Sequence, residues 1–130
     1  MKKTLILGFF TALSLPFFSS ISAFAGSLII EVPDDPKPSA QTLAYQCDIG
    51  TEKERIEATY LNAGSISLID FEWKNERVIG AQVIADTGIK YAGAHYIWLE
   101  TKKRVALYDL KNDPQEKKPI YCVEESTLLF

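Results

Sequence analysis

Apolar and polar residues alternate along short stretches of this chain, and the alternation constrains its fold more than any other feature. Within residues 55–61, Ile56, Ala58 and Tyr60 fall on one side, and charged or hydroxyl residues fall on the other. This period of two is typical of a half-buried β-strand. Residues 66–73 repeat the pattern, and no stretch shows sustained helical periodicity.

Turn-forming residues separate the alternating stretches at intervals of roughly 8–12 residues. Besides the two stretches above, strands are predicted at residues 43–47, 77–85, 91–100, 104–110 and 119–123. Short strands at this spacing favour an all-β fold, either an antiparallel sandwich or a barrel. Gly93, inside the longest predicted strand, is interpreted as a bulge or a bend.

The first 25 residues have the composition of a secretory signal peptide. Lys2 and Lys3 supply a positive start, residues 5–18 are mostly apolar, and residues 23–25 form the small-x-small pattern of a cleavage site. Cleavage there would leave residues 26–130, a length that predicts a single domain.

Residues 26–42 are expected to be a leader before the domain of residues 43–130. Within the leader, residues 27–32 form a candidate strand. Residues 33–39 contain three prolines and two aspartates. Proline lacks the amide hydrogen that a strand needs and the acids favour water, so we expect an exposed linker there.

The processed chain is acidic, with 12 lysines and arginines against 17 aspartates and glutamates, a net charge of −5. Such a chain without a long basic stripe is a poor candidate for binding nucleic acid or an anionic membrane surface. The signal is the only long apolar run, so no transmembrane helix is expected after cleavage. The junction has no cysteine for a lipid anchor. These features predict a small exported domain in the periplasm, or one released or held outside the cell.

The chain has two cysteines, Cys47 and Cys122. Export favours a disulfide between them, because the destination is oxidising. A loop of about 75 residues would be closed, which the chain-entropy model values at roughly 4 kcal/mol. The alternative, a pair of reduced or metal-binding thiols, is disfavoured by a single histidine and the lack of a Cys-x-x-Cys pair. No metal or other cofactor is expected.

Residues suited to catalysis are few. His95 is the single histidine, and we expect it in a strand with a structural role. The sequence has no nucleophile elbow, no His-Glu-x-x-His and no phosphate-binding glycine loop. Neighbouring acids such as Glu124 and Glu125 would point to opposite faces of an extended chain, so they are predicted to be solvated and not to act as an acid–base pair. The sequence does not indicate an enzyme.

Aromatic residues are frequent on the predicted strands: Tyr45, Tyr60, Phe71, Trp73, Tyr91, Tyr96, Trp98, Tyr108 and Tyr121. The preferred interpretation is that they fill the interior of a small β domain, which needs large apolar side chains. The alternative is a surface on which sugars or bases stack.

Two loops stand out, at residues 85–91 and 98–104. Residues 102–104 read Lys-Lys-Arg and are the one concentrated positive site of an acidic chain. They are either a solvated hairpin tip or a prong that faces an anion.

Several short motifs occur in a fixed order along the chain: residues 45–47, 60–64, 87–91, 96–98 and 106–110, and Cys122. Their order and spacing resemble those of the MliC/PliC family, the membrane-bound and periplasmic inhibitors of c-type lysozyme. The resemblance covers residues 43–122. It implies an eight-stranded antiparallel β-barrel closed by a disulfide between Cys47 and Cys122, and a c-type lysozyme as protein partner.

The resemblance also implies a binding site on the two loops. In the family, the first loop reads Ser-Gly-Ser-Gly-Ala-Lys/Arg-Tyr and the second carries Trp-x-x-Lys-Gly or a close variant; a serine and the lysine enter the lysozyme cleft. The corresponding lysozyme-binding residues are Thr87, Gly88, Lys90, Tyr91, Lys102 and Lys103. Lysozyme cleaves with two carboxylates, which an ammonium and a hydroxyl would neutralise and hydrogen-bond.

The sequence departs from the family pattern within both loops. Ala85 and Asp86 stand where the family has serine and glycine, Thr101 stands at the family lysine, and Lys102 stands at the following glycine. A carboxylate beside a catalytic carboxylate costs about 1–4 kcal/mol at 4 Å, unless Asp86 pairs with Lys90 or caps its own turn. The second hypothesis is therefore an exported binding module of the same fold with another protein partner.

Overall fold

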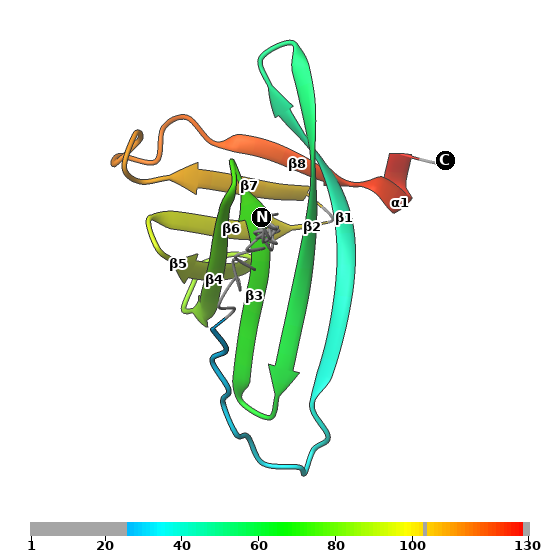
Figure 1. The fold of residues 1–130 in the computed structure, drawn as a ribbon. Coiled ribbons are helices and arrows are strands. Elements are labelled where there is room, and N and C mark those ends of the chain that lie inside the picture. Colours follow the sequence, from blue (N-terminus) through cyan, green and yellow to red (C-terminus); the bar gives the residue numbers. More distant parts are fainter. Residues whose placement is uncertain (1–25, 103, 129–130) are drawn as a thin grey trace, which may run out of the picture. The chain divides into compact units, whose positions relative to one another are not determined.

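Eight antiparallel strands form a closed barrel in chain order, with β8 beside β1 (Figure 1). The structure is a computed structural model that describes residues 26–102 and 104–128, so the predicted signal peptide lies outside the described residues. The elements are β1 Ser39–Ile49, β2 Glu52–Ala63, β3 Ile66–Trp73, β4 Glu76–Val83, β5 Ile89–Gly93, β6 Tyr96–Thr101, β7 Arg104–Asp109, β8 Ile120–Glu124 and α1 Glu125–Leu128. The predicted all-β, eight-stranded barrel is confirmed. In the described part of the chain, no helix has the length and apolar character needed to span a bilayer.

The barrel interior holds the side chains that the alternating pattern assigned to it. In β2, Ile56, Ala58 and Tyr60 are buried, while Glu57 between them is exposed. The aromatic prediction is confirmed for the side chains that fill the interior: Tyr45, Tyr60, Phe71, Trp73, Tyr91, Tyr96 and Trp98. Tyr108 and Tyr121 are the exceptions: Tyr108 is only half-buried, and the exposed ring of Tyr121 stacks under the guanidinium of Arg104 at 3.7 Å. Seven of the nine aromatic residues therefore form the core.

A disulfide joins the two strands that close the barrel. Cys47 of β1 lies opposite Cys122 of β8, and their sulfurs are 2.01 Å apart. All of β1 pairs with β2, but its pairing with β8 is short and runs only from Tyr45 to Cys47. The predicted disulfide is confirmed, and it reinforces a short seam of the sheet.

The start of the domain differs from the expectation. Residues 27–32 form no strand, and β1 begins at Ser39 instead of residue 43. Closure of the barrel already gives β1 its second neighbour, β8, so the fold does not require a further strand. Residues 33–38 are exposed, as the prolines predicted. The early start of β1 is supported by β2, since Thr42 and Thr59 share a hydroxyl–hydroxyl hydrogen bond of 2.9 Å.

The long predicted strand at residues 91–100 is wrong, because the chain reverses within it. Strands β5 and β6 form a hairpin whose turn is Ala94 and His95. Gly93 is not a bulge: it lies against β4 so closely that a Cβ there would fall 2.3 Å from the carbonyl oxygen of Ile79. His95 is thus a turn residue. It packs on the ring of Tyr96 at 4.1 Å and its Nε2 lies 3.5 Å from Asp109, a structural role as expected.

Candidate functional site

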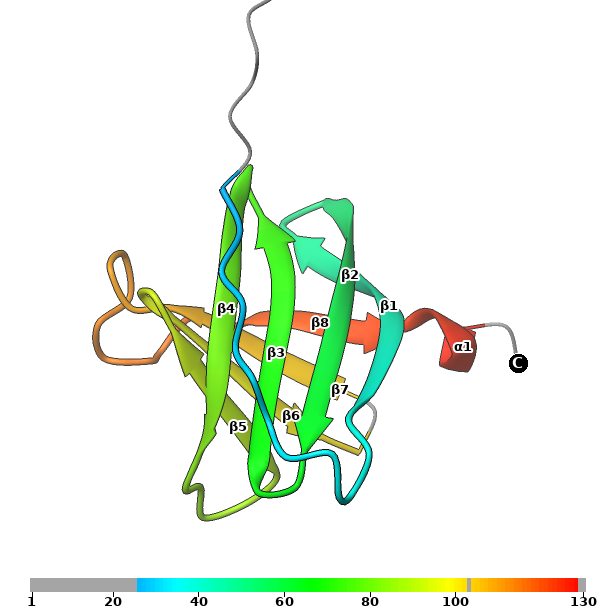
Figure 2. The same cartoon turned by 60° about the horizontal axis from the view of Figure 1, so that its bottom comes forward.

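The two loops singled out by the sequence lie at the same end of the barrel. Strand β5 begins opposite the end of β6, with Ile89 paired to Glu100. Residues 84–88, the β4–β5 loop, therefore lie beside Lys102, where the β6–β7 turn begins. Gly88 touches the end of β6 directly, since a Cβ on it would fall 2.3 Å from the carbonyl oxygen of Glu100. Figure 2 shows the β4–β5 loop extending past the ends of its strands, next to the β2–β3 turn.

The predicted site residues separate into exposed and buried groups. Thr87 and Gly88 are exposed in the β4–β5 loop. Lys90 is half-buried on β5, where it pairs with Val83 and Leu99. Tyr91 is buried inside the barrel, with its ring 5.9 Å from that of Tyr60. The structure thus brings the loop residues to the surface and uses Tyr91 to hold the strand beneath them.

The β6–β7 turn has a backbone that explains one departure from the family pattern. Lys102 is exposed and has a φ of 41°, the left-handed region that glycine adopts most readily. It stands where the family pattern has glycine, and it takes the conformation that a glycine would take. Because Lys102 lies in a turn and not in a strand, the rule that a one-residue shift places a side chain on the opposite face does not apply to it. Lys103 lies outside the described residues.

Asp86 is exposed in the β4–β5 loop and has no hydrogen bond or ion pair with another described residue. It therefore neither pairs with Lys90 nor caps its own turn. Its carboxylate is open to whatever approaches this end of the barrel.

Sequence reasoning missed a polar cluster directly beneath the loops. Tyr45 donates a hydrogen bond of 3.5 Å to the carboxylate of Glu100 and shares one of 2.8 Å with Tyr60. Trp98 Nε1 donates to the Tyr60 hydroxyl at 3.2 Å. Burial raises the pKa of the Glu100 carboxyl above its ordinary value, although hydrogen bonds from Tyr60 and Tyr45 act in the opposite direction. Burial also raises the pKa of Tyr45 to about 12.

The signal for this cluster is present in the sequence. Glu100 has the same parity along β6 as the buried Tyr96 and Trp98, so alternation points its side chain inward. The cluster fixes the end of β6, and the end of β6 in turn supports Gly88.

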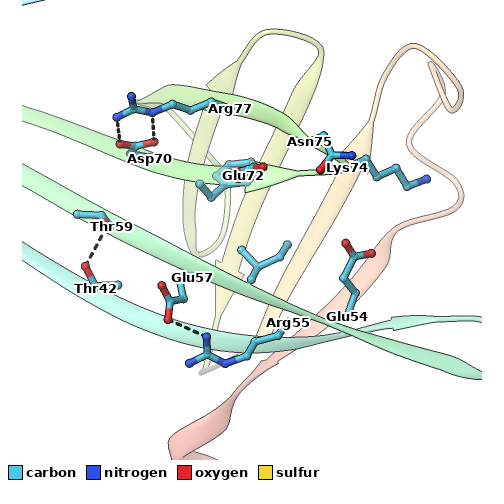
Figure 3. A pocket seen from close by; sticks show the side chains of 12 residues that line it. Thr42, Glu54, Arg55, Glu57, Thr59, Asp70, Glu72, Lys74, Asn75 and Arg77 are labelled. Carbon is cyan, nitrogen blue, oxygen red and sulfur yellow. Dashed lines mark hydrogen bonds and ion pairs between the residues drawn. The ribbon is translucent and has the colours of Figure 1, made fainter. Parts of the chain in front are cut away.

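Away from the loops, a concave region on the outer faces of β2 and β3 is lined by polar side chains that pair with one another (Figure 3). Arg77 forms two hydrogen bonds with Asp70, at 2.6 and 3.0 Å, and Arg55 bonds Glu57 at 2.7 Å. Arg55 of β2 and Gln46 of β1 both donate to Glu125, so Glu125 ties the start of α1 to these strands and is more than a solvated acid. Since its arginines are already neutralised, this region is a solvated surface. The described residues contain no cluster suited to a metal ion.

Comparison with known proteins places both loops inside a matched region. A family model described as MliC, membrane-bound lysozyme-inhibitor of c-type lysozyme, matches residues 45–116. The chain is similar to the crystal structure of Pseudomonas aeruginosa MliC in complex with hen egg white lysozyme, at 26% sequence identity and a TM-score of 0.62. That similarity covers 77% of this chain and 97% of the other chain. No curated protein matches.

Proposed function

The chain belongs to the MliC family of c-type lysozyme inhibitors, and from this premise we propose that it blocks a c-type lysozyme by placing the β4–β5 loop and the β6–β7 turn in the active-site cleft. The family is one of inhibitors and not of enzymes. The observation that carries the proposal is the direct contact between Gly88 and the end of β6, which joins the two loops into one projecting surface.

The chemistry follows from the carboxylates that lysozyme uses. The enzyme cleaves its glycosidic bond with two acids that flank the bond. In the proposed complex, the Thr87 hydroxyl and the Lys102 ammonium approach these acids, with Lys103 as the alternative cation. Charge-assisted hydrogen bonds to a carboxylate are short and strong, and they strengthen further once water is excluded from the cleft. Substrate is then excluded both sterically and electrostatically.

The remaining predicted residues are proposed to support these contacts. Gly88 allows the β4–β5 loop to pack closely on β6, and Tyr91 fixes β5 from inside the barrel. Lys90, half-buried on the outer face of β5, adds positive charge near the loop.

Charge and location fit the same function. A processed chain with a net charge of −5 is attracted over long range to a basic enzyme, and c-type lysozymes are usually basic. Lysozyme attacks the cell wall, which lies outside the inner membrane. We therefore place the inhibitor in the periplasm, or at the cell surface, where it protects the wall.

The test is lysis of a cell-wall suspension by a c-type lysozyme, with and without the protein purified after export. Inhibition should rise with the protein concentration until the two are equimolar. A lysozyme of a different structural class, assayed in parallel, should be unaffected. If the c-type enzyme lyses the walls equally fast with excess protein, the alternative of a binding module with another partner replaces this proposal.

A further inference from the structure

Exposed aliphatic side chains gather around the β4–β5 loop. Ile84 is 99% exposed, and Ile66, Val83 and Ile89 are 38%, 40% and 44% exposed. We call these four side chains the apolar rim. A single exposed aliphatic residue is ordinary on a protein surface. Ile79 on β4 is also exposed, but four such side chains at one end of the barrel require an explanation.

The apolar rim and the proposed inhibitory loop belong to the same surface. One hollow of about 530 Å³ is lined by Ile66, Val83 and Ile84 of the rim and also by Gly88. Ile84 precedes Thr87 by three residues, so their Cα atoms are at most about 11 Å apart. A partner that reaches Thr87 therefore comes close to Ile84.

We propose that Ile84, with Val83 and Ile66 beside it, docks on the apolar wall of the lysozyme cleft and supplies much of the binding energy; this inference rests on the proposed function. Ligand clefts are lined mainly by hydrophobic and aromatic side chains, with few polar groups at the reacting centre. Binding energy concentrates in a few apolar side chains that become fully desolvated near the centre of an interface.

The departures at the polar positions leave a loss of binding energy that such a contact would offset. Thr101 replaces the family lysine, and Asp86, which pairs with no other described residue, would bring a carboxylate to the same cleft. Both changes weaken the attraction to the catalytic acids. Contact through Ile84 does not depend on charge. Its binding energy would therefore offset the weaker attraction to the catalytic acids.

The experiment compares Ile84→Ser with Ile79→Ser in the full chain, purified after export. Ile79 is the matched control because it lies on the outer face of β4, the strand that leads to Ile84, and is 50% exposed, but it pairs with Asp70, well away from the loop. Ile84→Ser should raise the dissociation constant for a c-type lysozyme about 10- to 100-fold, the effect of losing one buried aliphatic side chain. Ile79→Ser should change it less than about twofold. Thermal melting of both variants establishes that each is folded.

Calorimetry measures the heat-capacity change of binding, which would not change if Ile84 had only a structural role. Burial of apolar surface makes the heat-capacity change of binding negative, so this change should be smaller in magnitude for Ile84→Ser than for the wild type. The Ile79→Ser variant should retain the wild-type value.

Three results would overturn the inference, and each is distinct. Equal affinities of wild type and Ile84→Ser would leave the inhibitor function standing but remove the apolar contact. A wild-type dimer in sedimentation that Ile84→Ser dissociates would assign the rim to a second copy of the chain. A wild type that neither binds nor inhibits lysozyme would refute the proposed function, and the inference with it.

Discussion

Gly88 packs against the carbonyl oxygen of Glu100 with no space for a side chain between them. A Cβ at this position would also fall 2.8 Å from Thr101 Cγ2, and the φ of Gly88 is 71°. Both the space and the backbone conformation therefore require glycine. The position of the β4–β5 loop is thus set by the end of β6, although the two are distant in sequence.

Gly88→Ala should weaken lysozyme inhibition by more than tenfold, because the loop must move away from β6 to accommodate the new methyl group. Gly50→Ala is the control: Gly50 has a φ of 60° in the β1–β2 turn, but a Cβ there meets no atom within 4 Å. Both variants should lose about 1–2 kcal/mol of stability from the left-handed backbone. Equal inhibition by both would mean that the loop contact is not needed for binding.

Replacing Lys102 and Lys103 together with alanine should weaken inhibition by at least about 2 kcal/mol, provided that either ammonium is buried against a carboxylate. The control is the same double change at Lys117 and Lys118, which are exposed in the β7–β8 loop at the other end of the barrel. This control removes the same amount of positive charge, so any change in the long-range attraction to lysozyme should be similar in the two variants. Titration of lysozyme activity measures both, and unchanged inhibition by the first variant would exclude insertion of the turn.

Asp86→Gly should tighten the complex by about 1 kcal/mol or more, because it removes a carboxylate from the neighbourhood of the catalytic acids. Asp86→Asn separates the two possible reasons. If charge is responsible, both variants gain affinity; if backbone freedom is responsible, only glycine does. Unchanged affinity in both would show that this loop does not reach the catalytic acids and would favour another partner.

Replacing Cys47 and Cys122 with alanine should lower the free energy of unfolding by roughly 4 kcal/mol, as expected for a crosslink that closes a loop of this length. Urea denaturation measures the loss. Reduced wild-type protein serves as the control, since it loses the crosslink but keeps both sulfurs. Because both cysteines are fully buried in a disulfide, thiol reagents should label neither residue without reductant. Ready labelling of the native protein would contradict the structure.

Glu100→Gln should stabilise the protein at neutral pH. The folded-state pKa of Glu100 is raised by burial, so the folded state holds this proton more tightly than the unfolded state does. The contribution of Glu100 to the free energy of unfolding is fully present below its unfolded-state pKa and is lost as the pH rises through its folded-state pKa. The difference in unfolding free energy between variant and wild type should therefore grow from about pH 4 and level off above the folded pKa. A constant difference would mean that the pKa of Glu100 is not raised.

The strands could be predicted from the sequence where one face of the sheet is buried, as β2 and β3 demonstrate. The β5–β6 hairpin could not be predicted, because its turn consists of Ala94 and His95. Ala94 adopts a φ of 49°, and the turn contains no glycine or asparagine that would indicate such a conformation. Tertiary pairing on both sides of the turn overrides the local preference. The error mattered, since the hairpin is what brings the two loops together.

The candidate site was predicted as a set of residues but not as a surface. The motifs identified Thr87, Gly88 and Lys102, whereas the contact between their loops depends on strand pairing that no local pattern encodes. Ile84 was assigned to a strand that in fact ends at Val83. Its exposure follows from where β4 stops pairing with β5, which is a property of the assembled barrel.

Closure of the barrel also bears on how such a protein survives in a crowded compartment. Each strand from β1 to β8 has a neighbour on both sides, although β1 pairs with β8 only over Tyr45–Cys47, so no strand of the described domain is a wholly free edge to which another chain can add and begin a fibril. An aliphatic docking surface is hazardous at high concentration mainly when an open sheet edge accompanies it. Here the β4–β5 loop contributes no residue to the strand pairing, so substitutions in it would leave the closure of the sheet intact.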